Sequence, residues 1–494
     1  MDACYYYSGG LNFVRGRGGS EYFVWNYLDD TAALPHPGFQ YWMPIPSVVA
    51  GMGMLLFRDG FRQSQIPFLI LAAGFPFFVY WLGKRLSGSF RISVLAGFFS
   101  VFSGFYTIYW MNTESFLIYA WLGGLIIALS TRITSPSRWI FTLLTGVLCG
   151  LAHMTRADGI LFLGLSGLLI LGGRSLNGRT KAGRLLLLGV GYFFASGIWF
   201  LRNMLTWRTL FPPGTGKTLW LTEYNDLFRI PSSELTWERF FSGGLQPILA
   251  ARIDAFLGNS LTTVFVLGLI FLFPLVSWGV IILRRKAETR AAVLYFLFIY
   301  LLMTIVYPFQ GSRGGFLHSS AALLSMAAVA ASIGLEDAIA RLSRLRNWNP
   351  SSAHAVMGAG TALLALFASG TIFFHRVIGT ASDGPDWASL NMEYSLGLSR
   401  LRETLTDSTR FMVNNPPCFY VTTGFQAVPV TAGTPAMLLD AVDRYGIQYV
   451  ILDANVPDGL RPLYQGTVTL SRLKEVFVEE HDGMVYVWFL VLPP

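Results

Sequence analysis

Ten apolar segments divide most of the chain, and each is long enough to cross a bilayer or nearly so. They occupy residues 66–83, 92–109, 115–131, 138–154, 160–173, 185–201, 262–283, 291–307, 317–334 and 354–373. Helix is the only state expected for such segments in lipid, because each backbone N–H and C=O must be paired within the segment. The pattern predicts a mainly α-helical transmembrane bundle over residues 66–375.

The loops between these segments alternate in charge. Lys and Arg are concentrated in loops 84–91, 132–138, 174–184, 284–290 and 335–353. In the intervening short loops 110–114, 155–159 and 308–316 the basic residues are Arg156 and Arg313. The positive-inside rule places the basic loops in the cytoplasm. Residues 1–65, the long loop 202–261 and the tail are then expected on the exterior face of a cytoplasmic (inner) membrane.

Residues 1–65 form an exterior first loop that is rich in aromatic and acidic residues. Its segment 41–57 is apolar, but Pro44, Pro46 and the charged residues after it favour a helix that lies in the membrane interface rather than a span. An exterior amino end needs a span to carry it across the membrane. We therefore expect a first transmembrane helix to be missing from the sequence ahead of Met1.

The tail, residues 376–494, has the pattern of a small α/β domain. Helical periodicity over 386–408 and around 434–445 alternates with short β-rich runs at 418–424 and 449–455. A hairpin is predicted with its turn at Asp482 and Gly483. The domain either recognises an acceptor or is a docking domain without chemistry.

Composition supports a membrane protein: 53% of residues are hydrophobic, 13% are charged and the mean hydropathy is +0.50. The net charge of +8 is spread over short loops, so it reflects topology and implies no nucleic-acid partner. Cys4, Cys149 and Cys418 are isolated in the sequence, so their spacing predicts neither a disulfide framework nor a cysteine-rich metal site.

Residues 211–218, FPPGTGKT, are close to a phosphate-binding P-loop. Phe211 takes the place of the first glycine, the stretch follows an apolar span instead of a β-strand, and it lies outside the cell in the expected topology. We therefore predict no ATP binding. Lys217 is either a solvated loop lysine or a contact for a lipid phosphate.

The order of several motifs resembles the GT-C superfamily of polytopic glycosyltransferases. These motifs are an Asp at the start of the first loop, HPGFQYW at 36–42, MNTESF around Glu114, HMTRADG at 153–159 and WFLRNMLTW at 199–207. The similarity is greatest to the branch of protein O-mannosyltransferases and lipid A aminoarabinose transferases. It covers most of residues 1–375, although Gly38 stands where that branch commonly has a proline.

The resemblance implies an inverting enzyme that transfers a sugar from a polyprenyl-phosphate donor to an acceptor at the exterior face. The acceptor is a protein, a lipid or a glycan. Asp2 resembles the first-loop Asp of the family and is the candidate general base. Glu114 is the second catalytic candidate: it orients the acceptor, binds a metal with Asp2, or caps a helix near Asn112 and Thr113. A divalent metal is possible but is not required by the sequence.

The remaining candidates surround these two carboxylates in the expected topology. An Arg among glycines can offer its planar guanidinium to a phosphate, so Arg313 is the first choice for the donor phosphate, with His318 one turn further on. Arg156 is a further phosphate candidate, although it and Asp158 are more simply explained as a pair. The other candidates are Lys217 for the phosphate and His36, Asp29, Asp30 and Tyr41 for substrate binding.

A transporter or flippase of lipid-linked sugars is the alternative from another class. Such proteins commonly show internal repeats and charges at mid-membrane depth. The sequence shows no clear repeat, and its ionisable residues concentrate in the exterior loops, which favours an enzyme.

Overall fold

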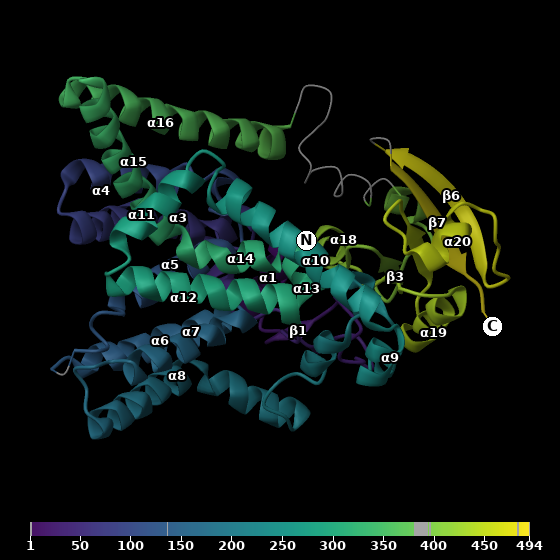
Figure 1. Cartoon of the computed structure of the whole chain (residues 1–494). Helices are drawn as coiled ribbons and strands as arrows, with labels where there is room; N and C mark the ends of the chain where they lie inside the picture. The colour runs from purple at the N-terminus through teal and green to yellow at the C-terminus, as the bar shows by residue number, and fades with distance from the viewer. Residues whose placement is uncertain (1, 136, 380–393, 395–396, 482–483, 494) are drawn as a thin grey trace.

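A computed structural model of the chain describes residues 2–135, 137–379, 394, 397–481 and 484–493. All ten apolar segments are largely helical, as predicted. The bundle contains α3 (Phe61–Ser87), α4 (Phe90–Val101), α5 (Ser115–Leu129), α6 (Trp139–Thr155), α7 (Leu161–Leu171), α8 (Gly178–Trp207), α10 (Leu245–Leu261), α11 (Phe273–Leu283), α12 (Ala287–Leu301), α14 (Phe316–Ser320), α15 (Leu324–Arg346) and α16 (Pro350–Phe373). A five-stranded sheet lies at one end of this bundle (Figure 1).

Within the described ranges, five helical segments are long and apolar enough to cross a membrane, and six further apolar helices are shorter. The long segments are Phe61–Ser87, Gly178–Trp207, Ala287–Val306, Pro308–Arg346 and Pro350–Ile378. The chain is thus a multi-pass membrane protein. Little of the long segment Pro350–Ile378 is buried, and α16 extends along one side of the bundle (Figure 1).

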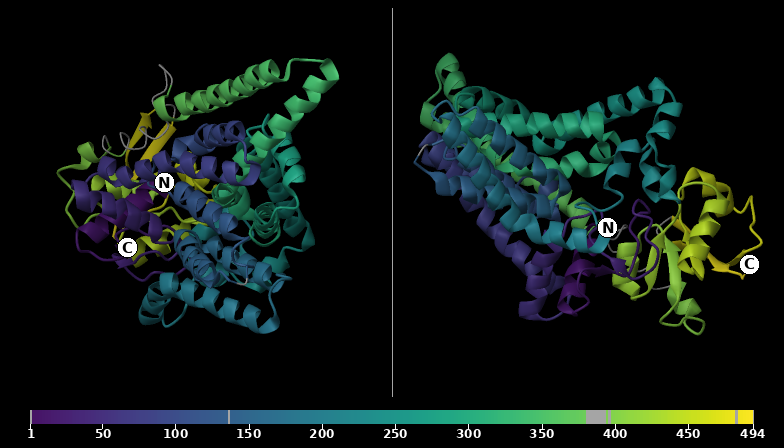
Figure 2. Two further views of the ribbon diagram at one scale, coloured as in Figure 1. Left: turned by 90° about the vertical axis from the view of Figure 1, so that its left-hand side faces the viewer. Right: turned by 90° about the horizontal axis from the view of Figure 1, so that it is seen from below.

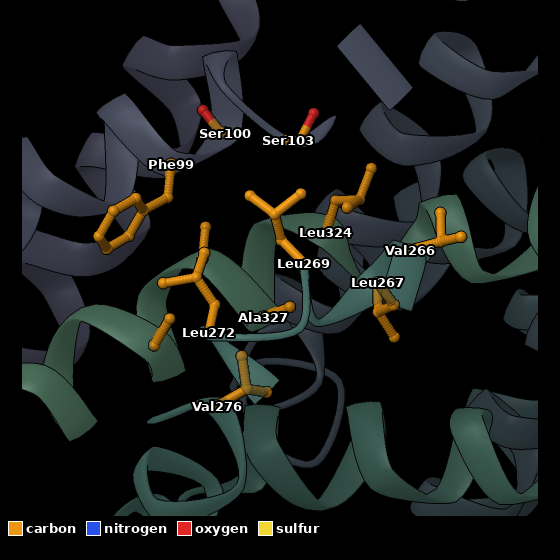
Figure 3. Close-up of a pocket in the computed structure, with 12 residues that line it drawn as sticks. Phe99, Ser100, Ser103, Val266, Leu267, Leu269, Leu272, Val276, Leu324 and Ala327 are labelled. Atoms are coloured by element: carbon orange, nitrogen blue, oxygen red, sulfur yellow. The ribbon is translucent and has the colours of Figure 1, made fainter. Parts of the chain in front are cut away.

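The predicted span 262–283 is wrong as a single helix. Its helical conformation is interrupted at residues 268–272, where Leu269 and Ile270 have positive φ angles of 43° and 55°. Side chains on both sides of this break line an apolar pocket between α4 and α15, with Phe99, Ser100 and Leu324 on its other walls (Figure 3). The break therefore places side chains of the bend in the wall of a small apolar pocket between helices.

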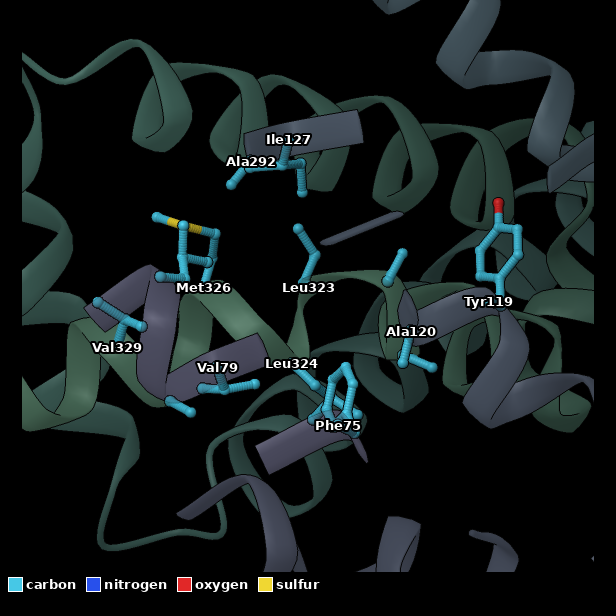
Figure 4. Close-up of a cluster of buried hydrophobic side chains, with 14 of the residues drawn as sticks. Phe75, Val79, Tyr119, Ala120, Ile127, Ala292, Leu323, Leu324, Met326 and Val329 are labelled. Atoms are coloured by element: carbon cyan, nitrogen blue, oxygen red, sulfur yellow. The ribbon is translucent and has the colours of Figure 1, made fainter. Parts of the chain in front are cut away.

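The bundle core is built where α3, α5, α12 and α15 meet (Figure 4). Gly123 lets α5 lie directly against the chain at Ala322, because a Cβ there would come within 2.4 Å of the Ala322 Cβ. The Tyr119 and Tyr295 hydroxyls, 2.9 Å apart, satisfy one another inside this core. Such close packing fixes α5, and with it Glu114 at its first turn.

Two short helices of the first loop, α1 (Asp2–Val14) and α2 (Ile45–Phe57), pack side by side. Gly10 permits this approach, since a Cβ there would lie 2.8 Å from the Ser47 carbonyl oxygen and 2.9 Å from the Gly51 nitrogen. Between them, β1 (Ser20–Glu21) pairs antiparallel with β2 (His36–Pro37). The long loop contains the short α9 (Trp237–Ser242) and several single turns of 3₁₀ helix, and α13 (Pro308–Gln310) precedes the Arg-Gly-Gly turn.

The C-terminal sheet has the strand order β4-β3-β5-β7-β6. Its strands are β3 (Arg410–Val413), β4 (Gln426–Pro429), β5 (Tyr449–Leu452), β6 (Leu473–His481) and β7 (Met484–Val491). The first three are parallel, and β7 joins them antiparallel to both β5 and β6. The predicted helix near 434–445 is present as α19 (Pro435–Tyr445), and the short α20 (Arg461–Tyr464) follows β5.

Three predictions for the tail, a β-rich run, a helix and a hairpin, have different outcomes. The β-rich run 418–424 is wrong: Cys418 to Thr423 lie in helix α18 (Pro416–Thr423), with the Asn415 side chain accepting a hydrogen bond from the Cys418 nitrogen. Of the predicted helix 386–408, residues 397–401 are helical, but most of its first half lies outside the described residues. The hairpin is confirmed as β6 and β7, and its predicted turn residues also lie outside.

The cysteines form one bridge that the sequence spacing did not predict. A disulfide joins Cys4 in α1 to Cys418 in α18, across 414 residues of chain. Cys149 is buried and free. The bridge attaches the first helix of the chain to the C-terminal sheet domain.

We expect the disulfide to stabilise the protein, because a cross-link restricts the unfolded chain and its loss typically costs about 2–5 kcal/mol. Dithiothreitol should therefore lower the midpoint of thermal unfolding of the wild type and of the control Cys149→Ala. The same reductant should leave Cys4→Ser, which already unfolds at a lower temperature, unchanged. A wild-type midpoint that is insensitive to reductant, with Cys4 open to maleimide labelling, would contradict the bridge.

Candidate functional site

Three ionisable side chains from distant parts of the chain meet at the end of the bundle nearest the sheet. Asp2 begins α1, Glu114 precedes α5 and His318 lies in α14; one ligand atom from each lies within 4.8 Å of the other two. The His318 Nε2 is 3.5 Å from an Asp2 carboxylate oxygen. We call these residues the Asp–Glu–His cluster. It unites both catalytic candidates with one of the phosphate candidates.

Neighbouring residues fix the His318 ring. The Phe116 ring stacks on it with centroids 3.8 Å apart, and its Nδ1 lies 3.3 Å from the Ser115 hydroxyl. Glu114 occupies the N-cap position of α5, but its side chain accepts no capping hydrogen bond there. The Glu114 side chain therefore does not cap α5, which was one of the predicted roles, and its carboxylate lies in the cluster instead.

Three contacts hold Asp2 in place through the first turns of α1. The Thr113 hydroxyl donates to the Ala3 carbonyl at 2.9 Å, which ties α1 to the residue beside Glu114. The Tyr5 hydroxyl donates to buried Glu21, whose same carboxylate oxygen also accepts the Phe39 N–H at 2.7 Å. The Cys4 disulfide supplies the third connection.

Burial controls the protonation of the two carboxyls. Glu114 is 7% exposed, and desolvation, with the Asp2 charge as a second cause, raises its pKa to about 8. Burial also raises the pKa of Asp2, against the opposing attraction of Arg156. Two close carboxyls in a dry site ionise in sequence. Asp2, which has 28% of its side chain exposed, therefore ionises first and Glu114 retains its proton at neutral pH.

Arg156 and Asp158 form the predicted pair beside the cluster. The guanidinium binds both carboxylate oxygens of Asp158, at 3.1 Å from Nε and 2.9 Å from Nη2. Arg156 also donates to the Ser319 hydroxyl at 3.2 Å, and Ser319 in turn donates to Asp158. The pair thus fixes α14 next to His318. Sequence reasoning missed Ser319, because a serine inside an apolar span carries no distinguishing signal.

Arg313 contacts an aromatic ring, and no carboxylate of the described residues forms an ion pair with it. Its guanidinium stands 5.2 Å from the centroid of Tyr224 in the long loop. Burial raises the pKa of Tyr224; the Asp2 charge adds to this and the Arg313 charge opposes it, so the tyrosine senses both groups. Gly314 follows with a φ of 114°, which gives Arg313 an exposed turn instead of a regular helix.

Tyr41 belongs to the same neighbourhood. Desolvation raises its pKa, with contributions from Tyr224 and Asp2 and an opposing one from Arg156. Tyr6, on α1, is a neighbour that the sequence did not single out; burial raises its pKa, and the Asp2 charge adds to this. The charges of Asp2 and Arg156 therefore act on both tyrosines, whose hydroxyls stay protonated because burial raises their pKa.

The remaining candidates hold loops together. Lys217 makes an ion pair with Asp30 at 3.0 Å and donates to the Leu28 carbonyl at 2.8 Å. The Gly214 N–H donates to Asp29 at 2.6 Å, and desolvation raises the pKa of Asp29 to about 6. These contacts join the first loop to the FPPGTGKT segment, whose Gly214 N–H and Lys217 ammonium are bonded to protein groups.

His36 is buried inside the first loop. Its Nε2 lies 2.9 Å from the Phe23 carbonyl oxygen and 3.8 Å from Glu21. It is therefore connected to the support of α1 through Glu21 and lies outside the Asp–Glu–His cluster.

No known family profile matches the chain, and no curated protein sequence matches it. Solved structures do. ArnT from Cupriavidus metallidurans bound to undecaprenyl phosphate is similar over 99% of this chain and 93% of its own, with a TM-score of 0.53 and 13% identity. The apo state of the same protein gives the same coverage and identity with a TM-score of 0.55. The chain therefore has the fold of ArnT, in agreement with the fold that the resemblance of its motifs implied.

Proposed function

We propose that the protein is a membrane glycosyltransferase that transfers a sugar from a polyprenyl-phosphate-linked donor to an acceptor. The observation that carries this proposal is the Asp–Glu–His cluster in a fold shared with ArnT, for which a structure with bound undecaprenyl phosphate exists. A carboxylate in such a position suits removal of a proton from an acceptor hydroxyl.

The proposed reaction is a single displacement with inversion. Asp2 takes the proton of the acceptor hydroxyl, and the hydroxyl oxygen forms a bond to the anomeric carbon of the sugar. The bond from that carbon to the phosphate oxygen breaks, and polyprenyl phosphate leaves with the electron pair. Asp2 suits the base because it ionises before Glu114.

We assign the donor phosphate to Arg313. Its guanidinium is exposed and contacts Tyr224 without an ion pair among the described residues, so its donors are open to a phosphate. Arg156 contributes positive charge from behind the cluster, although its N–H groups are bonded to Asp158 and Ser319. Lys217 and Asp30, with Asp29 and His36, serve by fixing the loops around the site.

The cluster also fits a divalent cation. Two carboxylates and an imidazole present three mixed oxygen and nitrogen ligands within 4.8 Å, which suits a borderline metal such as Zn²⁺ or Mn²⁺. When bound, such an ion would supply positive charge near the departing phosphate. Asp2, Glu114 and His318 are the residues that would hold it.

The disulfide supports an exterior site. Disulfides form and persist in oxidising compartments, and Cys4 lies two residues from Asp2. The C-terminal sheet domain is at the other end of the same bond. We therefore place α1 and this domain on the exterior, or periplasmic, face of the inner membrane, where the charge pattern of the loops also puts them.

Asp2→Asn should reduce sugar transfer by about 10²–10⁴-fold, because a general base typically contributes that much. Arg313→Gln should raise the KM for the donor. The assay uses membranes with radiolabelled polyprenyl-phosphate sugars, and Asp458→Asn, an exposed carboxylate of the C-terminal sheet domain, is the control. Transfer that survives both substitutions would refute the site. Movement of label across vesicles without any transfer would identify a flippase instead.

Cation affinity should depend on pH through Glu114. Because its pKa is raised to about 8, a cation bound below that pH must displace the Glu114 proton. Affinity for Zn²⁺ should therefore increase with pH and level off above about 8. Calorimetry in two buffers of different ionisation enthalpy measures the released proton. Glu114→Gln should lose this release and bind at least about tenfold more weakly; pH-independent binding would exclude Glu114 as a ligand.

A further inference from the structure

The turn between α2 and α3 exposes apolar and basic side chains together. Leu55 and Leu56 are 69% and 74% exposed, and Met52, Phe57 and Phe61 are also exposed. Arg58 and Arg62 lie among them. We call residues 52–62 the α2–α3 tip. A surface of this composition is typical of a segment at the boundary between acyl chains and headgroups.

The tip lies at the level expected for that boundary. α3 is one of the five long apolar segments, and the tip is at its amino-terminal end. In Figure 2 the purple amino-terminal helices lie at the periphery of the bundle, at the end that carries the C-terminal sheet. The exposed side chains of the tip therefore lie on the outside of the bundle, next to the end of an apolar helix.

Two arginines of the tip are free to bind an external anion. Asp59, the acidic residue of the tip, is engaged by Arg15 at 3.2 Å. Arg17 nearby is occupied by the Tyr420 hydroxyl at 3.1 Å and by the ring of Tyr22. Within the part of the chain that the structure describes, Arg58 and Arg62 have neither an ion pair nor a side-chain hydrogen bond.

The backbone of Arg58 adopts a conformation that favours glycine. Its φ of 80° and ψ of 165° lie in a region that is almost restricted to glycine. A glycine would make the same turn without strain. Arg58 has no protein partner among the described residues. An arginine at this strained position is therefore best explained by a partner outside the chain that binds its guanidinium.

We propose that the α2–α3 tip binds the phosphate headgroups of anionic membrane lipids in the leaflet at this end of the bundle. The apolar side chains enter the acyl region, and Arg58 and Arg62 reach the phosphates above it. Charge complementarity identifies the occupant, because the tip carries two unpaired cations and its carboxylate is already bonded to Arg15. This binding is independent of the transfer reaction.

The test measures which lipid surrounds the tip. A fluorophore is attached to Leu56→Cys in the full chain, where the native cysteines are bridged or buried. The protein is placed in nanodiscs with brominated phosphatidylglycerol or brominated phosphatidylcholine, and quenching reports the local lipid. We expect phosphatidylglycerol to be enriched around the probe by roughly three- to tenfold.

Arg58→Gly separates binding from folding. It relieves the backbone strain, so thermal stability should be kept or raised, while the enrichment should fall several-fold; Arg62→Gln should lower it as well. Arg208→Gly is the matched control, because Arg208 is also exposed and ends a helix with a positive φ of 61°. Its enrichment should equal that of the wild type. Equal quenching by both lipids in the wild type, or unchanged enrichment in Arg58→Gly, would overturn the proposal.

Inorganic phosphate distinguishes a lipid from a free anion. At equal ionic strength phosphate should weaken the enrichment more than chloride does, because it screens charge and also competes for the two guanidinium groups, but part of the enrichment should remain because the apolar side chains still hold the tip in the membrane. If phosphate alone abolishes the enrichment, the tip is a site for free phosphate and the lipid proposal is wrong.

Discussion

The burial of two carboxyl groups beside one another constrains this structure more than any other contact. Removing a carboxylate from water is costly, and a second one at close range adds repulsion. The protein keeps Asp2 and Glu114 together because one of them holds its proton and an imidazole lies beside the other. The pair therefore carries one negative charge, on Asp2, while Glu114 stays protonated, which leaves Asp2 as the group that can accept a proton.

Support for this pair comes from the whole length of the chain. α1 brings Asp2, α5 brings Glu114, and α14 brings His318, while Arg156 and Asp158 fix the position of α14 through Ser319. None of these segments is adjacent in sequence to another. Only the packing of the helices brings these side chains together. The fold is shared with ArnT at 13% identity, which is consistent with a helix arrangement that is kept while most of the packing residues change.

Much of this arrangement is readable from the sequence. The apolar segments are long and follow the physics of the bilayer, so their positions were predicted well, and the Arg156–Asp158 pair follows from its spacing. The break at Leu269 and Ile270 was not predicted, although Gly268 before it and Pro274 after it are residues that commonly end or begin a helix, because the continuous apolar run favoured a single span. In α18, β-branched and aromatic residues concealed clear helix signals: Asn415 at the N-cap, two prolines after it, and Gly424 at the end.

The acid cluster was only partly predictable. A shared metal site of Asp2 and Glu114 was one of the alternatives that the sequence offered, but the contact with His318, which was expected at the donor phosphate, depends on how three helices cross. Lys217 and Asp30 were assigned to ligands from their exterior position, whereas their ion pair with one another requires two loops that are far apart in sequence to meet. The disulfide is hidden for the same reason, since two cysteines 414 residues apart leave no local pattern.

That bond also imposes an order on assembly. It encloses the helices from α2 to α16 in a single covalent ring, so it cannot close before α16 has been synthesised and Cys418 has followed it. The helix that carries Asp2 is made before these helices and receives its covalent attachment after them. The surroundings of Asp2 are therefore completed only when the C-terminal sheet domain has reached α1.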